Sequence, residues 1–321
     1  MNYKFYNEDC ISGAQKHIED NSIDLIITDP PYGIGGDKLH KHYNRNEDHV
    51  IDGYVEVAAA EYETFSEQWI HEASRILKPG GSIYIVSGYT NLFYILKALR
   101  QTQLKELNHI IWKYNFGVYT KTKYVSSHYH ILYYIKPGAK HTFNTFCRHD
   151  ALEKSGSGGS KNYEDREDVW AINKEYKPGQ KKNKNELPKA LLKKMIAYSS
   201  HPGNWVCDMF LGGFSTAKVA LEMGRYATGF EISQNMFDHQ IREMQKIKFR
   251  SLAEFSQRTN ELRSNQGVPW TPQELFKLKN RFNTLYKKHG TKKKTIELLC
   301  EEFGRGRFGI VNALKKAGGK Q

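Results

Sequence analysis

The sequence predicts an α/β fold, with a mostly parallel, doubly wound sheet followed by a small helical domain. Three observations favour this fold. Short apolar runs alternate with stretches of helical periodicity over the first three quarters of the chain. Two of these runs end in an acidic residue that begins a loop, which is typical of strands that hold ligands at their carboxyl ends. The last quarter has helical periodicity only and carries nearly all of the excess positive charge.

The first part of the chain alternates strands with helices. The predicted strands cover residues 3–7, 23–28, 82–86, 108–113, 205–208 and 226–231, and the predicted helices cover 10–19, 64–77, 91–100, 187–198 and 214–223. Residues 23–28 form a compact apolar run, typical of a strand buried on both faces of a parallel sheet. Pro30 and Pro31 end this strand, because proline has no N–H to donate to a ladder. The polar residues 33–57 show no period, and so long a loop is expected to have a functional role.

Residues 114–185 interrupt the alternation. They are rich in Lys, Asn, Tyr and Gly, contain the run Ser-Gly-Ser-Gly-Gly-Ser at 155–160, and have a strand-like period only at 129–135. We expect a flexible insertion on the scaffold of a catalytic domain that covers residues 1–245.

Residues 246–321 are predicted to form a separate basic domain. They contain 18 Lys and Arg against 6 Asp and Glu, so they hold most of the chain's net charge of +13. This excess favours a polyanionic partner such as the phosphates of DNA, and a merely solvated tail is the alternative. Residues 232–261 are predicted to be helical, and further helices at 271–289, 295–303 and 307–317 indicate a helix-turn-helix-like unit.

Local signals in this tail are specific. Thr271 and Glu274 predict a capping box at the start of a helix, and Gly290 and Gly304 predict helix ends. Trp270 is expected in the core of the unit rather than stacked on a base. The best candidates for phosphate contacts are Lys287, Lys288, Lys292, Lys293, Lys294, Arg305 and Arg307.

Composition disfavours several other classes of protein. No run approaches the roughly 20 apolar residues of a membrane span, and residues 1–9 lack the layout of a signal peptide, so we expect a cytoplasmic protein without membrane contact, nucleoid-associated when bound to DNA. The four cysteines include no CxxC pair, and His128 and His130 alternate along a strand-like run, so we expect reduced thiols and no metal site.

The first chemical motif is Asp29-Pro30-Pro31-Tyr32 at the end of the buried run. An exocyclic amine is conjugated with its base and is a poor nucleophile. Hydrogen bonds to the Asp29 carboxylate and the Pro30 carbonyl would free its lone pair, while Tyr32 offers a stacking face for an extruded base. The prolines hold the acceptors rigidly. The alternative is an ordinary turn that ends a strand.

The second motif runs from Asp208 to Thr216, between a predicted strand and a helix. Gly212 and Gly213 let the backbone approach a ligand, and Glu231 at the end of the next strand suits two ribose hydroxyls. The GxGxxG fingerprint of dinucleotide sites is missing, which disfavours an oxidoreductase.

With these motifs in this order, the sequence resembles the β group of DNA amino-methyltransferases, in which the DPPY motif precedes the cofactor motif. The resemblance covers residues 3–240 and also involves Asn7 to Cys10, Arg75 to Gly81 and Pro188 to Ile196. It implies a Rossmann-like, S-adenosylmethionine-dependent methyltransferase fold, with residues 114–185 as the target-recognition region.

The resemblance also assigns residues to the cofactor. Asp9 would contact its adenine end, Glu231 its ribose, and Asp208 with Phe210 and Gly212 its methionine end, while Lys189 or its neighbours would close the pocket. The full expected set is Asp9, Cys10, Asp29, Lys189, Asp208, Phe210, Gly212, Gly213, Phe214, Ser215, Thr216 and Glu231.

The chain departs from the family pattern at three places. Phe214 places a bulky residue where the family has glycine, Met209 replaces the usual proline, and the segment before Leu187 lacks the common His-Pro-Thr. Phe214 and Met209 are expected to alter cofactor affinity.

The function expected from the resemblance is site-specific methylation of adenine N6 in double-stranded DNA, by direct transfer to a flipped-out base. Asp at the first motif position, rather than Ser, favours adenine over cytosine N4. A catalytically idle DNA-binding relic and an RNA substrate are further alternatives. A homodimer and a cognate restriction enzyme are the protein partners to be expected.

Overall fold

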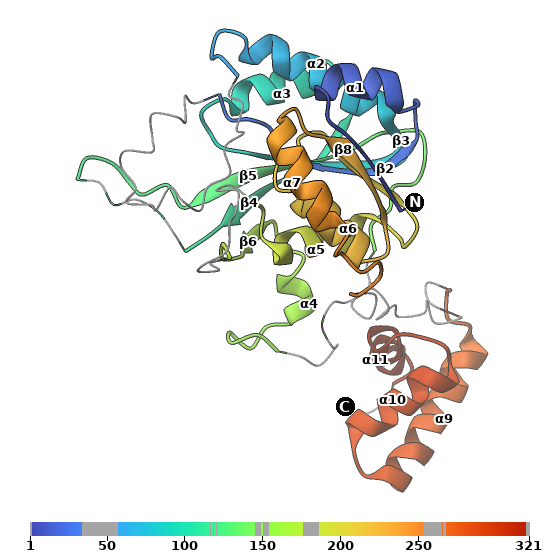
Figure 1. The fold of residues 1–321 in the computed structure, drawn as a ribbon. Helices are drawn as coiled ribbons and strands as arrows, with labels where there is room; N and C mark the ends of the chain where they lie inside the picture. Colours follow the sequence, from blue (N-terminus) through green and yellow to red (C-terminus); the bar gives the residue numbers. More distant parts are fainter. Residues whose placement is uncertain are drawn as a thin grey trace. The chain divides into compact units, whose positions relative to one another are not determined.

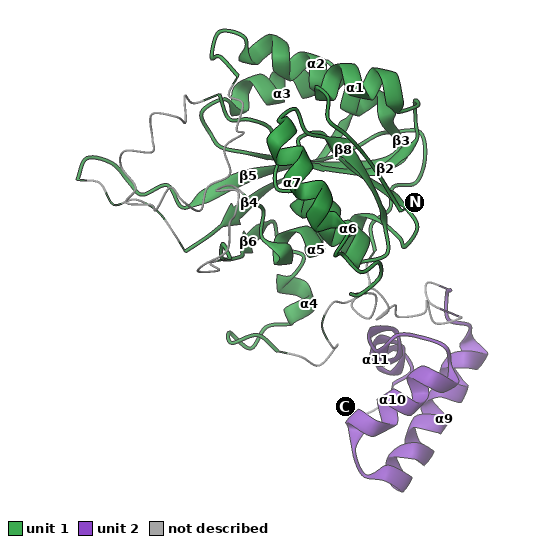
Figure 2. Cartoon of the chain, viewed as in Figure 1, with its two compact units in different colours: residues 1–257 green, residues 258–321 purple. Residues whose placement is uncertain are grey.

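The computed structural model describes residues 2–33, 57–115, 117, 119, 121–144, 149, 154–175, 186–252, 265 and 268–318. The predicted loop at 33–57, much of the insertion, Cys147 and the second half of the predicted helix 232–261 lie largely or wholly outside these residues. The chain divides into two compact units, residues 1–257 and residues 258–321 (Figure 2).

The first unit is built on one mixed sheet. Its strands are β1 (Tyr3–Tyr6), β2 (Ile23–Thr28), β3 (Leu77–Ser87), β4 (Lys105–Lys113), β5 (His128–Ile135), β6 (Val169–Ala171), β7 (Trp205–Asp208) and β8 (Tyr226–Phe230). Their order across the sheet is β1-β8-β7-β2-β3-β5-β4-β6. Pairings from β1 to β3 are parallel, and β5 runs antiparallel to both neighbours. A mostly parallel, doubly wound sheet is therefore confirmed.

Helices cover both faces of this sheet (Figure 1). They are α1 (Cys10–His17), α2 (Tyr62–Ile76), α3 (Leu92–Arg100), α4 (Lys161–Glu164), α5 (Lys189–Ser199), α6 (Ser215–Glu222) and α7 (Gln234–Met244). α1, α2 and α3 pack against one face, and α5, α6 and α7 against the other. Because β2 is covered on both faces, its apolar residues alternate between the two cores, Leu25 and Ile27 in one and Ile26 in the other.

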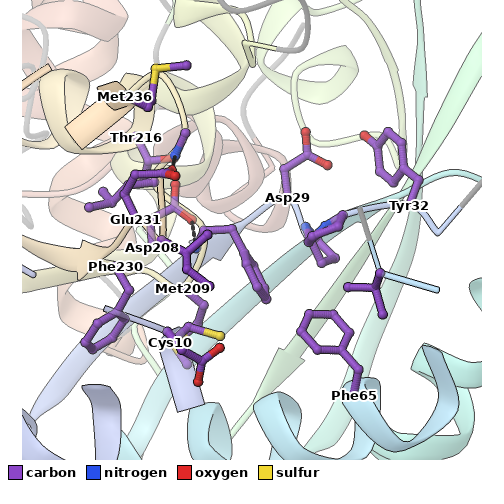
Figure 3. A pocket seen from close by; sticks show the side chains of 18 of the residues that line it. Cys10, Asp29, Tyr32, Phe65, Asp208, Met209, Thr216, Phe230, Glu231 and Met236 are labelled. Atoms are coloured by element: carbon purple, nitrogen blue, oxygen red, sulfur yellow. Dashed lines mark hydrogen bonds between the residues drawn. The ribbon is translucent and has the colours of Figure 1, made fainter. Parts of the chain in front are cut away.

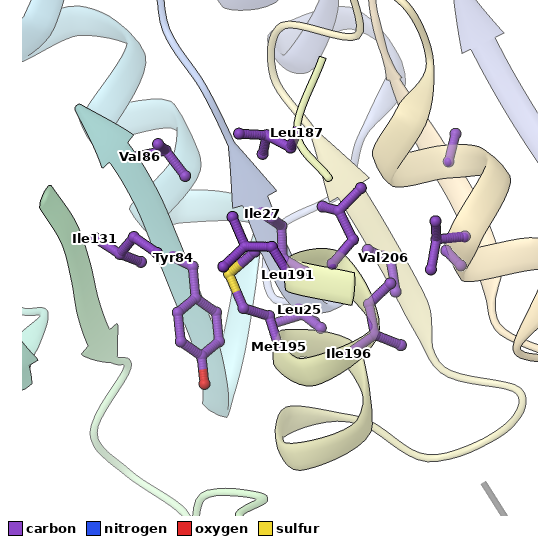
Figure 4. Close-up of a cluster of buried hydrophobic side chains, with 14 of the residues drawn as sticks. Leu25, Ile27, Tyr84, Val86, Ile131, Leu187, Leu191, Met195, Ile196 and Val206 are labelled. Carbon is purple, nitrogen blue, oxygen red and sulfur yellow. The ribbon is translucent and has the colours of Figure 1, made fainter. Parts of the chain in front are cut away.

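The core beneath α5 shows how side chains hold this arrangement. Leu191 and Met195 from the helix pack onto Leu25 and Ile27 of β2 (Figure 4). Burial of each such side chain contributes about 1.5–3 kcal/mol. The sheet and its helices are thus fixed closely enough to hold the loops at the strand ends.

The predicted insertion at 114–185 is too broad. Residues 128–135 form β5, which lies between β3 and β4 in the sheet, and β6 extends the same sheet beside β4. The described residues between β4 and β5 contain no helix, and such a connection suits an antiparallel pair, which the alternation of strands and helices did not reveal. The described residues outside the sheet in this range are 114–115, 117, 119, 121–127, 136–144, 149, 154–168 and 172–175.

The boundary between the units also differs from the expected 245/246. Residues beyond α7 fold back on the first unit, where the backbone N–H of Leu252 donates to the Glu222 carbonyl and the Leu252 side chain packs against the core. The boundary therefore lies at 257/258.

The second unit contains α9 (Pro272–His289), α10 (Lys292–Glu302) and α11 (Arg307–Lys316) around a core of its own. The capping box predicted at Thr271 and Glu274 is present, and Gly290 ends α9 in the left-handed conformation that favours glycine.

Candidate functional site

Four neighbouring strands of the first unit end beside one cavity. β1, β8, β7 and β2 are adjacent and parallel, and the acidic residues at or just after their ends include Asp9, Glu231, Asp208 and Asp29. All four line a cavity of about 620 Å³. Figure 3 shows Asp29 and Tyr32 on one side of it and Asp208 and Glu231 on the other. A volume of this size suits a ligand rather than a few waters.

Asp29 lines the cavity and keeps one carboxyl oxygen without a hydrogen bond from the described residues. Its Oδ1 atom is shielded from solvent and accepts no hydrogen bond from the described residues. Burial raises the pKa of Asp29 to about 7, and repulsion from Asp208 adds to this rise, while a hydrogen bond from Tyr32 and the charge of Lys174 oppose it. An unpaired, buried carboxyl oxygen is costly, so its retention indicates a functional role.

The loop that carries Asp29 is fixed from two sides. The Tyr62 hydroxyl donates to the Pro31 carbonyl at 2.8 Å, and the Asn91 side chain donates to the Tyr32 carbonyl at 2.6 Å. No described residue donates to the Pro30 carbonyl. Two acceptors, the Asp29 carboxylate and the Pro30 carbonyl, are thus held next to each other without a described donor on Oδ1 or on the carbonyl.

Tyr32 is part of an aromatic cluster. The Tyr32 ring stacks on Tyr129 of β5, with ring centroids 5.7 Å apart. Tyr129 contacts Tyr114 and Trp112, and the Lys174 ammonium lies 4.8 Å from the Tyr129 ring centroid. The cluster therefore contains planar rings on which a base could stack. It also contains the Lys174 ammonium, whose charge lowers the pKa of Asp29.

Asp208 is embedded in hydrogen bonds. Its Oδ1 atom accepts from the Thr28 hydroxyl at 3.0 Å and from the Phe210 N–H at 3.1 Å. Burial raises the pKa of Asp208 to about 7, and hydrogen bonding, including one from Thr216, opposes the rise. Thr28 precedes Asp29, so the ends of β2 and β7 are tied together directly.

Glu231 organises the loop after β7. Its two carboxylate oxygens accept from the backbone N–H groups of Gly212 and Ser233, each at 2.8 Å. Gly212 has a φ of 48°, and a Cβ at Gly213 would lie 2.4 Å from Glu186 Oε1. Burial raises the pKa of Glu231. Gly212 thus suits the left-handed turn beside the carboxylate, and a side chain at position 213 would displace Glu186 at the cavity.

Asp9 has a local structural role besides its place at the cavity. Its side chain caps α1 by accepting from the backbone N–H groups of Ile11 and Ser12. The adjacent Cys10 also lines the cavity, and burial raises the pKa of its thiol well above the usual range. The thiol is thus protonated at neutral pH.

The structure brings most of the residues expected from sequence to this one cavity. Lining it are Asp9, Cys10, Asp29, Pro30, Pro31, Tyr32, Asp208, Phe210, Gly212, Gly213, Ser215, Thr216 and Glu231. Met209 lines it as well.

Two expected cofactor residues lie elsewhere. The Lys189 ammonium pairs with Glu222 on α6, and its neighbours Glu186 and Leu187 line the cavity instead. Phe214 is fully buried in the core, where its ring packs edge-on against Phe5, so it does not obstruct the cavity. Its φ of 58° turns the chain so that the side chain points inward.

Sequence reasoning missed the wall contributed by α2. Phe65 and Gln68 line the cavity, and Phe65 packs against Phe210 with ring centroids 5.7 Å apart. The sequence showed the apolar stripe of this helix. It did not show that one end of the stripe faces the loop after β7. Met236 on α7 was missed for the same reason.

The basic residues expected in the second unit divide into two groups. Lys287, Lys288, Lys292, Lys293 and Lys294 are exposed, and Arg307 is half-buried. Arg305 is buried: it lies over the Trp270 ring, donates to the Val268 and Pro269 carbonyls and pairs with Glu274. Arg305 therefore fixes the start of α9 to the turn before α11, and is not a phosphate contact.

Metal and membrane features are limited. Among the described residues, no group of three or more His, Cys, Asp or Glu is placed to hold a metal ion, and no helix has the length and apolarity of a membrane span. His130 accepts or donates one hydrogen bond with His109 at 2.8 Å. Cys10, Cys207 and Cys300 are buried free thiols.

Comparison with known proteins gives a consistent result. A family model described as DNA methylase (N6_N4_Mtase) matches residues 23–243. The type II methyltransferase M.HpaI of Haemophilus parainfluenzae is 33% identical over 70% of this chain and 69% of its own length.

Two solved structures share the fold. The M1.HpyAVI complex with S-adenosylmethionine matches with a TM-score of 0.51 and 19% identity, over 75% of this chain and 98% of its own. The cytosine-N4-specific PvuII DNA methyltransferase matches with a TM-score of 0.57 and 15% identity, over 80% and 92%. At these identities the likeness shows the fold alone.

Proposed function

The chain belongs to the N6/N4 DNA methylase family, and from this premise we propose that it transfers a methyl group from S-adenosylmethionine to N6 of an adenine in double-stranded DNA. The observation that carries the proposal is the pair of open acceptors at Asp29 and Pro30, next to the stacking face of Tyr32 and on the cavity that also contains Asp208 and Glu231. DNA methylation is the activity of the family; adenine as the target is our inference.

The cavity residues fit the parts of the cofactor. Glu231 keeps lone pairs for two ribose hydroxyls, because each of its oxygens accepts one backbone N–H. Asp208 and Asp9 place negative charge at either side of it, which suits the cofactor's cationic groups and its adenine amine. S-adenosylmethionine, when bound, supplies a sulfonium-activated methyl group.

The chain's own residues prepare the amine. Its two N–H groups donate to Asp29 Oδ1 and to the Pro30 carbonyl, which draws the nitrogen lone pair out of conjugation and toward the methyl carbon. The amine would then take the methyl group that a bound cofactor supplies, with the thioether as the leaving group. The amine then loses one proton, which Asp29 accepts; a carboxyl with a pKa of about 7 can take and release it at neutral pH.

Adenine is favoured over cytosine by the residue that begins the motif. Asp29 supplies a charged acceptor, where Ser is common among cytosine-N4 enzymes. Asp29 and Tyr32 are both present, and Tyr62 and Asn91 hold the backbone beside them, which disfavours an idle relic.

The second unit and the described part of the insertion are proposed to hold the DNA. Exposed Lys287, Lys288 and Lys292 to Lys294 suit phosphate contacts, each adding about 0.9 to the logarithmic salt slope of binding. Similarity to a type II methyltransferase favours a companion restriction enzyme that cuts the same site when unmodified.

Mass spectrometry of DNA digested after incubation with the enzyme and labelled cofactor tests the proposal. We expect N6-methyladenine from the native chain and from the surface control Asp238→Asn, and a strongly reduced yield from Asp29→Ala. N4-methylcytosine as the only product would overturn the choice of base. Near-normal methylation by Asp29→Ala would overturn the role of Asp29.

A further inference from the structure

The second unit contains two helices joined by a short turn. α10 ends at Glu302, α11 begins at Arg307, and Gly304 in the turn has a φ of 59°. α9 packs against both, and the three helices share one core. Figure 2 shows the three helices gathered in one compact unit. Two helices joined by a short turn and packed on a third are the elements of a helix-turn-helix unit, in which α11 would be the second helix.

α11 has one buried face and one exposed face. Ile310, Ala313 and Leu314 lie in the core. Phe308 is 81% exposed, and Asn312 and Lys315 are exposed too. These three positions are four and three residues apart, so they share one face of the helix. A phenylalanine, an amide and a cation in one exposed row have the chemistry to contact base edges.

The first turn of α10 carries positive charge that complements duplex DNA. Lys292, Lys293 and Lys294 occupy the first turn of α10, which contains no acidic residue and has no side-chain cap from Thr291. Positive charge at the positive end of a helix dipole is unfavourable. A phosphate placed there would offset this repulsion and would also accept from the uncapped backbone N–H groups. In a helix-turn-helix unit the first helix crosses the DNA backbone, and here these lysines lie at the start of that helix, α10.

We propose that α11 is a recognition helix that enters the major groove, with Phe308, Asn312 and Lys315 facing base edges. An asparagine amide can pair with adenine N6 and N7, a lysine ammonium with guanine O6 and N7, and a phenyl ring can contact a thymine methyl group. The inference rests on the proposed function only in taking duplex DNA as the substrate. It gives the enzyme a base-reading surface separate from the insertion in the first unit.

The test selects duplexes from a randomised library with the full chain, without cofactor, and sequences those bound. Asn312→Ala and Phe308→Ala are compared with Asn283→Ala and Phe276→Ala, matched exposed residues on α9. We expect Asn312→Ala to lose roughly 5- to 100-fold preference for one base at one position, and Phe308→Ala to lose preference at a neighbouring position. The α9 controls should keep the native preferences.

Three results would overturn the proposal. One is an unchanged sequence preference in both α11 variants and in Lys315→Gln, a surface change that spares the core. Another is a loss of affinity that is equal for all sequences. The third is conversion of a dimer to a monomer by Phe308→Ala with native DNA preference, which would make this face a self-association surface.

Methylation of a short duplex by the native chain is measured in parallel. Loss of methylation together with an α11-dependent sequence preference would refute the proposed function alone. Methylation without any such dependence would refute the recognition helix alone.

Discussion

Asp29 and Asp208 end two adjacent strands of the same sheet, yet their carboxylates are held differently. Burial raises the pKa of each to about 7. Asp208 Oδ1 accepts from Thr28 and Phe210, whereas Asp29 Oδ1 has no described donor. Similar burial thus gives similar acidity, and it is the hydrogen bonds that separate the two roles. The Asp208 Oδ1 atom, bonded twice, positions a loop and its ligand, whereas Asp29, which accepts a hydrogen bond from Tyr32, keeps Oδ1 available for an amine.

The largest expected effect comes from changing the open carboxylate. Asp29→Asn should lower the maximal methylation rate by about 10²–10³-fold, the usual cost of removing one preorganised charge-stabilising group. Its affinity for S-adenosylmethionine, measured by calorimetry, should stay within about threefold of native. A tenfold loss of cofactor affinity would mean that Asp29, like Asp208, contributes to cofactor binding.

Tyr32 sharpens the same comparison on the DNA side. Tyr32→Ala should weaken use of DNA by roughly 5- to 100-fold, because stacking of a base on an aromatic ring contributes about 1–3 kcal/mol. Tyr32→Phe keeps the stacking face and should lose less, and the loss of its hydrogen bond should raise the pKa of Asp29. Steady-state kinetics with varied DNA measures both; equal losses would indicate that the hydroxyl, not the ring, is what matters.

Asp208→Asn should act on the other ligand. Loss of the charge should raise the dissociation constant of S-adenosylmethionine about tenfold, in the range of a charge-assisted hydrogen bond. The amide still accepts from Thr28 and Phe210, so the fold should be retained. Calorimetry measures the cofactor affinity and thermal unfolding checks the fold. Native cofactor affinity in a folded variant would contradict the predicted tenfold loss.

The smallest effect concerns pH. Asp29 has a pKa raised to about 7, so its carboxylate form prevails above that pH, and the methylation rate should fall as pH drops through 7. Lys174 lowers this pKa, so Lys174→Met should move the acid limb of the rate profile to higher pH and reduce the rate a few-fold at pH 7. An acid limb at the same pH as in the native enzyme would show that Lys174 does not lower the pKa of Asp29.

Much of this site could be predicted from the sequence because its residues lie directly after strands. The bounds of β2 and β7 agree with prediction, since apolar runs that end in Asp mark them clearly. Parallel strands place their carboxyl ends at one edge, so Asp29, Asp208 and Glu231 were expected together.

What could not be predicted depends on contacts between distant residues. The place of β5 in the sheet follows from pairing with β3 and β4, which no local pattern records. Arg305 looked like a phosphate contact because its charge is visible in the sequence, whereas its burial over Trp270 is not. Phe214 looked obstructive because its left-handed backbone, which turns the ring into the core, requires the structure.

Single-turnover methylation at saturating S-adenosylmethionine and DNA tests the distinction between the two aspartates most directly. Asp208→Asn should recover a rate within about threefold of native once its weaker cofactor binding is saturated, while Asp29→Asn should remain about 10²–10³-fold slow. Recovery of the native rate by Asp29→Asn, or an equally slow Asp208→Asn, would contradict the assignment of Asp29 as the acceptor that acts on the amine.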